Sequence, residues 1–227
     1  MDRNLTIILP SYRSKKLILS HLKSLSKNYK IIVIENSYDI SLEKIIKNKY
    51  KNVEVYLKKN IGYGRAVNFA AKRVKTKFFL VINPDTKIYK NTLKNLIKYS
   101  KKLKNFGAIG PIYENQKNKF KKKLVKVNKL VSAAMLINTK TFLKIKGYDE
   151  NFFLYYEDDD FFLKCNLRNL DIYNITNSFI KHNKSKVVKK TLNLHSTTFS
   201  NFKERNSTFV VGGWHGQWSK FYFYRKN

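Results

Sequence analysis

Carboxylates are scarce in this sequence, so their positions are informative about chemistry. The chain has 47 Lys and Arg residues and 15 Asp and Glu residues, and six of those 15 acids lie between Asp149 and Asp160. Four of them are consecutive, at positions 157–160, with aromatic residues on both sides. Neighbouring carboxylates repel one another and aromatic rings desolvate them, so such a run has a folding cost that something must offset.

Two readings of the acidic run are open. A helix N-terminus favours anions through its dipole and free amides, and the run would then serve only to start a helix. Alternatively, the run holds a functional carboxylate. On a helix that begins at Glu157, Asp158 shares a face with Phe162 and Cys165 and is expected to point inward. A carboxylate held there can act as a general base.

Two further residues could bind a metal ion. Asp85 follows the apolar run 78–82 directly, in an Asn-Pro-Asp motif, and His182 follows a second apolar run at 178–180. Taken alone, Asp85 fits an ordinary turn and His182 fits a surface or hydrogen-bonded histidine. As a pair they would supply one oxygen and one nitrogen ligand to a hard divalent cation, with nucleotide phosphates completing its shell.

The hydrophobic pattern predicts a framework that would bring these residues together. The first hundred or so residues alternate short apolar runs with stretches of helical periodicity, which is typical of β-α-β units in a parallel sheet. In such a sheet, ligands bind at the carboxyl ends of the strands. The predicted strands are 6–9, 31–34, 53–56, 78–82 and 108–109, and the helical patterns between them lie around 17–25, 42–46, 66–74 and 93–97.

The second half of the sequence is less regular. Residues 115–129 hold seven lysines and little apolar periodicity, which predicts a mobile or acceptor-facing loop rather than a core element. The predictions that follow are a strand at 131–137, a short helix at 141–145, a turn at 147–149 and a helix at 157–169. The structural state of the aromatic tail, residues 191–227, is not predicted.

A glycine loop at 60–65 precedes the helical pattern at 66–74. It matches neither the P-loop nor the dinucleotide-binding motif. With Arg65 at a helix N-terminus the loop can receive phosphate, or it can be an ordinary tight turn.

The composition limits the class of protein. With 227 residues, 43% of them hydrophobic, the chain can form one large domain with a real core. Its longest apolar runs have five residues, whereas a membrane-spanning helix needs roughly 20. The single cysteine, Cys165, excludes an internal disulfide. Because the first residues also lack a signal-peptide pattern, we expect a cytoplasmic protein.

The net charge of +32 indicates an anionic partner, such as nucleic acid, phospholipid headgroups or a phosphorylated substrate. A second explanation is equally strong. The chain is crowded with Lys, Asn, Ile, Tyr and Phe, the residue set that an A/T-rich coding sequence would give, so compositional bias also accounts for the charge.

Together, the motifs resemble the family 2 glycosyltransferases, and particularly their rhamnosyltransferase-like branch, over about residues 5–186. The resemblance implies an α/β fold of GT-A type, with a mostly parallel, Rossmann-like central sheet flanked by helices and a short C-terminal appendage. The matching segments are 8–12 (first strand and nucleotide-contacting turn), 35–39 (second-strand motif), 60–68 (Asn-x-Gly-x-Gly), 83–85 (the DXD element) and 147–153 with 157–158 (the acceptor-side segment with the catalytic base).

The resemblance also implies roles for individual residues. Asp158 is expected to be the catalytic base of an inverting transfer. Asp85 and His182 are expected to hold a divalent metal, Mn²⁺ or Mg²⁺, that neutralises the leaving nucleoside diphosphate. The nucleotide-sugar donor is expected to be bound by Pro10, Ser11, Tyr12, Asp39, Arg65, Asn83 and Asp85. The acceptor or the donor sugar is expected to be contacted by Asp149, Glu150 and Glu157.

The activity implied is sugar transfer from a nucleotide-sugar donor, dTDP-rhamnose first and a UDP-hexose next, to a glycan or lipid-linked acceptor in cell-surface polysaccharide synthesis. The catalytic domain is expected at 1–186, with a nucleotide-binding half to about residue 110 and an acceptor half at 111–186, followed by an aromatic and basic appendage at 187–227. We also expect peripheral attachment to the anionic inner face of the membrane, with residues 214–226 forming the contact.

Two alternatives from other classes remain. A nucleic-acid-binding protein would explain the charge and the aromatic residues, but the acidic run at 157–160 would repel phosphate. A catalytically inactive GT-A domain that serves as a scaffold is the second alternative, and the presence of both Asp85 and Asp158 argues against it.

Overall fold

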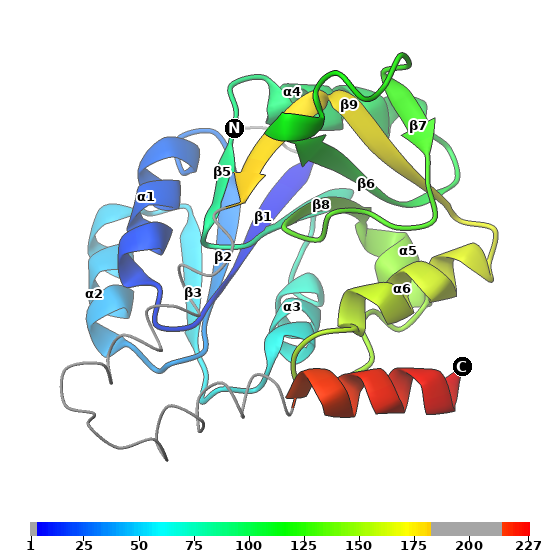
Figure 1. Cartoon of the computed structure of the whole chain (residues 1–227). Coiled ribbons are helices and arrows are strands. Elements are labelled where there is room, and N and C mark those ends of the chain that lie inside the picture. Colours follow the sequence, from blue (N-terminus) through cyan, green and yellow to red (C-terminus); the bar gives the residue numbers. More distant parts are fainter. Residues whose placement is uncertain (1–3, 183–214) are drawn as a thin grey trace, which may run out of the picture.

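The structure is a computed structural model that describes residues 4–182 and 215–227. In these residues a nine-stranded sheet carries helices on both faces (Figure 1). The strands are β1 Leu5–Ser11, β2 Lys30–Glu35, β3 Val53–Leu57, β4 Phe78–Ile82, β5 Thr86–Ile88, β6 Phe106–Tyr113, β7 Leu124–Lys126, β8 Ala134–Asn138 and β9 Asp171–His182. The helices are α1 Lys15–Leu25, α2 Ile40–Lys49, α3 Tyr63–Ala71, α4 Thr92–Lys102, α5 Thr139–Lys144, α6 Glu157–Asn166, a short 3₁₀ helix Glu114–Gln116 and a C-terminal helix at 215–226.

The order of the strands confirms the predicted α/β class. Across the sheet the order is β3-β2-β1-β4-β8-β6-β9-β5, with β7 paired to β9. The first four strands in this order are parallel neighbours. Strand β8 runs antiparallel to both β4 and β6, whereas β6 and β9 are parallel to each other. The parallel half is the part that the β-α-β pattern of the sequence predicts.

The core lies on both faces of the sheet because the strands are apolar on both sides. Leu5, Ile7 and Leu9 of β1 pack with residues of α1, α2 and α4. Ile8, which points the opposite way, packs with residues of α3, α5 and α6. A parallel sheet covered on both faces reads as a continuous apolar run, and this is why β1, β2 and β4 are evident in the sequence.

The predicted loop at 115–129 is partly wrong. It contains the short strand β7, which pairs antiparallel with β9 at the edge of the sheet. Three residues, only partly covered, are too few to give a detectable alternation of polar and apolar side chains. Element ends also shift: the predicted strand at 131–137 begins at Ala134, and the predicted helix at 157–169 ends at Asn166.

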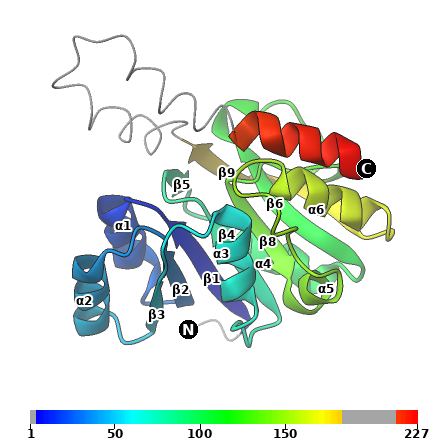
Figure 2. The ribbon, with the colours of Figure 1, turned by 90° about the horizontal axis from the view of Figure 1, so that it is seen from below.

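The tail forms a helix at 215–226, which lies beside α6 in both Figure 1 and Figure 2. Of the predicted appendage at 187–227, residues 187–214 fall outside the described part of the chain, as does the predicted boundary at 186. Among the helices of residues 4–182 and 215–227, none combines the length and apolar composition needed to cross a bilayer.

The start of α3 is held against the loop that precedes α6. Gly62 has φ +86°, and a Cβ on it would lie 2.6 Å from the backbone oxygen of Phe153. The next residue, Tyr63, donates its N–H to that same oxygen at 3.0 Å. Only glycine accepts both this conformation and this close approach. The glycine loop therefore joins the parallel half of the sheet to the acidic segment.

Candidate active site

The carboxyl ends of β1, β2 and β4 meet at one edge of the sheet. The Ser11 hydroxyl donates to the buried Glu35 carboxylate at 2.5 Å, and the Asn36 N–H donates to the Ser11 carbonyl at 2.7 Å. Because β8 runs antiparallel to β4, its amino end lies at the same edge, where the Asn83 N–H donates to the Ala133 carbonyl at 2.9 Å. This is the edge at which ligands bind in open α/β sheets.

Asp85 and His182 lie together at this edge, as the metal prediction requires. Strand β5 pairs with the end of β9, with Thr86 opposite His182. This pairing brings Nε2 of His182 to 3.0 Å from Oδ1 of Asp85. Nδ1 of His182 is buried and makes no hydrogen bond within the described residues.

The pair fits part of a divalent-cation site. Two ligands at right angles on an ion with bonds of about 2.1 Å lie about 3 Å apart, which matches the Asp85–His182 separation of 3.0 Å. Within residues 4–182 and 215–227 no group of three or more His, Cys, Asp and Glu side chains is placed to hold an ion. Two protein ligands therefore require phosphate or water oxygens to complete the shell.

His21 also lies beside Asp85, which the sequence did not predict. Its Nε2 is 3.1 Å from the Pro84 carbonyl oxygen. Burial lowers the pKa of His21, and this effect outweighs the contacts with Pro84 and the charge of Asp85, which would raise it. His21 lies on α1, far from Asp85 in sequence, and nothing in its local pattern marks it.

Tyr63 lies between the Asn83–Asp85 turn and the acidic run. Its hydroxyl donates to Oδ1 of Asn83 at 2.9 Å. Burial raises the pKa of Tyr63 well above its usual value, and the charges of Glu157, Asp158 and Asp85 raise it further. One phenol thus lies within electrostatic reach of all three carboxylates.

Asp158 is half-buried and has a polar partner. The Ser132 hydroxyl donates to its Oδ2, and the Asp159 N–H donates to its Oδ1 at 3.0 Å. Burial raises the pKa of Asp158 above its usual value; the Ser132 hydrogen bond opposes this shift, and the charge of Asp159 adds to it. A carboxylate that is partly desolvated and held by a hydroxyl has the properties of a general base.

The other carboxylates of the run are compensated in different ways. Asp160, 1% exposed, pairs with Lys164 at 3.0 Å and Lys226 at 2.7 Å. Asp159 pairs with Lys129 at 3.3 Å near the surface. Glu157 is 5% exposed, and its Oε2 has no hydrogen-bond partner in the described residues.

Glu157 is compensated by keeping its proton. Burial raises its pKa to about 8, with a further contribution from the negative charge of Asp158. At neutral pH Glu157 is therefore largely uncharged, and the repulsion within the run is reduced. The run does begin α6, so the helix dipole contributes as well. The two readings of the acidic run are compatible.

The remaining predicted site residues lie in two groups. At the sheet edge, Pro10 is buried in β1, Tyr12 follows it half-buried, and Asp39 caps α2 by accepting the Leu42 N–H at 2.9 Å. Although burial opposes it, hydrogen bonding lowers the pKa of Asp39, so this carboxylate is charged.

The second group lies beside the acidic segment. Arg65 donates through Nε to the Glu150 carbonyl at 2.8 Å, so it contacts the acidic segment. The Glu150 side chain accepts from Asn68 at 3.1 Å. Asp149 is bound by the C-terminal helix, through Lys226 at 2.6 Å and Tyr222 at 3.1 Å.

Sequence reasoning missed Ser132, Tyr63, Asn68 and Lys226. Asn68 holds the 147–150 turn by exchanging hydrogen bonds with the backbone of Tyr148 at 2.9 and 3.0 Å. In the sequence, Asn68 stands among the apolar residues of the helical pattern that becomes α3. Its position there indicates a structural role, because an amide buried among apolar residues must find hydrogen-bond partners. Lys226 lies among 47 cations, and nothing local distinguishes it.

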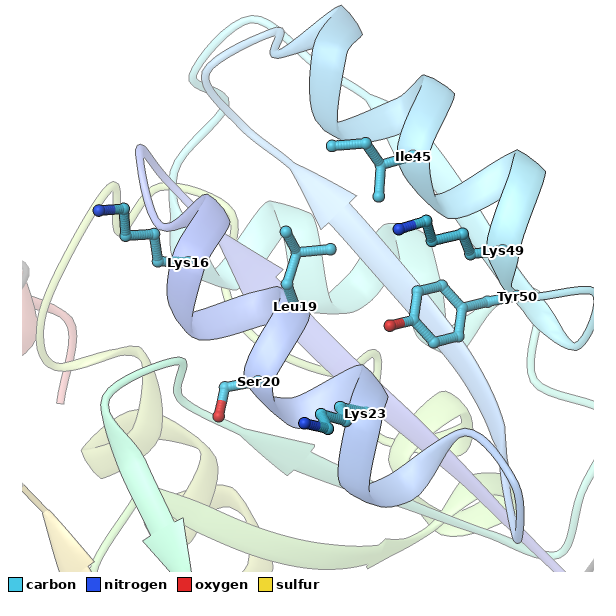
Figure 3. Close-up of a pocket in the computed structure, with 7 residues that line it drawn as sticks. All are labelled: Lys16, Leu19, Ser20, Lys23, Ile45, Lys49 and Tyr50. Carbon is cyan, nitrogen blue, oxygen red and sulfur yellow. The ribbon is translucent and has the colours of Figure 1, made fainter.

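A surface groove of about 460 Å³ lies elsewhere, between α1 and α2. Leu19, Ile45 and Tyr50 point toward one another in it (Figure 3). Its lining contains lysines but no carboxylate and no histidine. None of the predicted site residues lines it, so we do not assign chemistry to this groove.

The fold and the site together define an α/β protein with carboxylates and a histidine gathered at the ligand-binding edge of its sheet. The model of the family described as "Glycosyl transferase family 2" matches residues 6–175, well over half of the chain. The chain belongs to this family. A comparison with curated proteins gives no match.

Solved structures share the fold. A structure of GalNAc-T7 with UDP, GalNAc and Mn²⁺ has a TM-score of 0.65 at 13% identity, covering 79% of this chain and 43% of that one. S. aureus TarS 1–349 in complex with UDP has a TM-score of 0.62 at 20% identity, covering 78% and 60%. The mannosyltransferase PcManGT from Pyrobaculum calidifontis, with GDP-Man and Mn²⁺, has a TM-score of 0.66 at 11% identity, covering 82% and 59%. The chain spans less than two thirds of each of these structures.

The raised pKa of Glu157 predicts a pH-dependent stability. The folded state keeps the Glu157 proton up to about pH 8. The stability that this bound proton adds to the folded protein is therefore complete below the unfolded-state pKa of Glu157 and is lost as the pH rises through the folded-state pKa. Between pH 5 and 8, wild type should lose stability relative to Glu157→Gln by up to about 1.4 kcal/mol per pH unit. Urea unfolding across this range measures the difference. Glu54→Gln, at an exposed position of β3, is the control, and parallel profiles for wild type and Glu157→Gln would contradict the assignment.

Proposed function

We propose that this protein is an inverting glycosyltransferase that moves a sugar from a nucleotide-sugar donor to a hydroxyl acceptor. The observation that carries the proposal is the position of Asp158, half-buried, hydrogen-bonded to Ser132 and near the same phenol as Asp85. Family membership over residues 6–175 supports it. A nucleic-acid-binding role gains no support, since Asp158 and Asp159 would repel phosphate.

The donor is a nucleoside diphosphate sugar. The related structures hold UDP, UDP-GlcNAc or GDP-Man, so the chemistry they share is a nucleoside diphosphate, which in two of the three carries a sugar. Resemblance to the rhamnosyltransferase-like branch places dTDP-rhamnose first and a UDP-hexose next. We propose a glycan or lipid-linked acceptor. Ser11, Asp39 and Asn83 lie near the strand ends where the nucleotide would bind.

Asp85 and His182 would hold a divalent cation, Mn²⁺ or Mg²⁺. When bound, the cation neutralises the negative charge of the diphosphate leaving group. Asn83, held by Tyr63, positions the turn that carries Asp85.

Asp158 takes the proton from the acceptor hydroxyl in one concerted displacement. The acceptor oxygen forms a bond to the anomeric carbon as the bond to the diphosphate oxygen breaks on the opposite face, so the configuration inverts. Ser132 orients the carboxylate. The raised pKa of Asp158 makes it a stronger base than an exposed aspartate.

Asp158→Asn keeps the shape of the side chain but removes the proton acceptor. We expect the rate of nucleoside diphosphate release from the donor to fall about 10²–10⁴-fold, with nucleotide affinity nearly unchanged. Asp159→Asn is the matched control, because Asp159 pairs only loosely with Lys129 at the surface, and it should lose far less activity. Asp160 is unsuitable as a control, since it is buried between two lysines. A stable Asp158→Asn protein with near wild-type turnover would exclude the mechanism.

Asp85→Ala should abolish the manganese-dependent stabilisation by nucleoside diphosphate, because a ligand that binds only the folded state raises the melting temperature. A thermal-shift panel of UDP, GDP and dTDP, with and without Mn²⁺ or Mg²⁺, measures this. Asp171→Ala, which removes a carboxylate paired with Lys126 on another strand, should keep the effect. Equal nucleotide affinity in excess chelator, measured by calorimetry, would show that no metal takes part.

We also propose that the outer face of the C-terminal helix contacts anionic membrane. Trp218, Phe221 and Tyr224 are 44%, 57% and 68% exposed on this face, and the chain carries a net charge of +32. Aromatic residues on one face of a basic amphipathic helix are typical of interfacial binding, to which each nearby Lys or Arg adds about 1 kcal/mol. Trp214, named in the prediction, lies outside the described residues.

Replacing Trp218 and Phe221 together with serine should reduce co-sedimentation with vesicles that contain phosphatidylserine by about tenfold or more, since burial of each aromatic side chain contributes about 1.5–3 kcal/mol at most. Leu167→Ser is the control, because Leu167 is 72% exposed at the end of α6. Equal wild-type binding to neutral and anionic vesicles at low salt would count against the proposal.

A further inference from the structure

The inner face of the C-terminal helix docks on the segment that leads into α6. Ser219, fully buried, donates its hydroxyl to the Leu154 carbonyl at 2.9 Å. The Tyr222 ring packs edge-on against Phe152, with centroids 4.9 Å apart, and its hydroxyl contacts Asp149. The His215 ring stacks on Phe153 and Lys226 reaches Asp149. Four residues on one face of the helix thus contact one loop.

The loop under this helix has an unusual backbone. Tyr155 and Tyr156 are consecutive residues with φ values of +70° and +67°. Residues other than glycine rarely adopt this backbone region, and such strain persists only where the surrounding structure imposes it. Tyr156 is also the N-cap of α6, without a capping side chain. Its conformation sets the direction in which α6 begins, two residues before Asp158.

Lys226 connects the two ends of this strained segment. Its Nζ lies 2.6 Å from Oδ2 of Asp149, before the loop, and 2.7 Å from Oδ1 of Asp160, in the first turn of α6. Asp160 is almost completely buried. Burial alone would raise the pKa of Asp149, but its bond with Lys226 and its other hydrogen bonds lower it, so the carboxylate is charged. A cation between two carboxylates in a partly buried place is a strong geometric constraint.

We propose that Lys226, with Tyr222 and Ser219, acts as a positioning group that fixes the 149–156 loop and the first turn of α6, and thereby the place of the Asp158 carboxylate. The proposal rests on Asp158 being the base of the proposed reaction. Lys226 itself touches no reacting atom. A displacement of about 1 Å at a reacting group can cost about 10²-fold in rate, so a loose first turn of α6 would lower turnover without changing donor binding.

Lys226→Met keeps the length of the side chain and removes its charge. We expect kcat for nucleoside diphosphate release to fall about 10- to 100-fold, with the KM for donor unchanged within about twofold. Lys226→Arg, which can still bridge two carboxylates, should restore most of the activity. The matched control is Lys126→Met, which removes the 2.5 Å ion pair between Lys126 at the end of β7 and Asp171 at the start of β9 and should leave both constants unchanged.

Amide hydrogen exchange provides a readout that does not depend on turnover. In Lys226→Met, residues 152–160 should exchange at least about tenfold faster, while β1, β4 and β8 keep their protection. Unchanged exchange and unchanged kcat would overturn the proposal. So would an equal loss of kcat and nucleotide affinity that arginine does not restore, since that pattern indicates general misfolding.

A milder variant covers the case in which Lys226→Met does not fold. Tyr222→Phe removes only the hydroxyl bonded to Asp149 and Asn151 and should produce the same pattern at smaller amplitude. Failure of the proposed function is separately visible: if Asp158→Asn keeps full turnover while exchange in 152–160 responds to Lys226, the helix holds the segment but Asp158 is not the base.

Discussion

The site depends on one constraint: four carboxylates lie together at the start of α6. Burial excludes water from much of this segment, so the carboxylates cannot all be charged there without partners. Each acid meets this constraint differently. Glu157 keeps its proton, Asp158 accepts from Ser132, Asp159 pairs with Lys129 near the surface, and Asp160 binds two lysines. Asp158 is the one that combines a charge-stabilising hydroxyl with partial exposure. The other three acids are protonated or paired with lysines, so they add little repulsion to the partly desolvated Asp158 carboxylate.

The topology of the sheet determines which chemical groups can reach that carboxylate. Because β8 is inserted antiparallel beside β4, the amino end of β8 lies beside the carboxyl end of β4. Ser132 precedes β8 and Asn83 follows β4, so the partner of Asp158 and the turn that carries Asp85 are neighbours. In an all-parallel sheet the residues before a strand would lie at the opposite edge. The reversed strand therefore joins the acidic segment to the carboxyl ends of the parallel strands.

The sequence was sufficient for the parallel half of the sheet, since strands buried on both faces such as β4 read as continuous apolar runs. It also singled out Asp85 and His182, which the structure places 3.0 Å apart, because one lies just after the apolar run of β4 and the other at the end of β9. It was insufficient where a structure depends on contacts between distant segments. Strand β7 has three residues, His21 approaches Asp85 from α1, and Lys226 is one of 47 cations. No local pattern marks these residues, because their roles come from packing rather than from periodicity.

The structure assigns a specific role to only a few of the described positive charges. Within the described part of the chain, most of the lysines lie on the surface without a buried partner, and this is equally consistent with compositional bias and with attraction to an anionic surface. Lys226 and Lys164 differ, because they are placed against a carboxylate that is 1% exposed. Replacing a surface lysine changes the general field of the protein, which salt screens. Replacing either of these two would leave a buried charge with less compensation, and that cost is local and largely independent of salt.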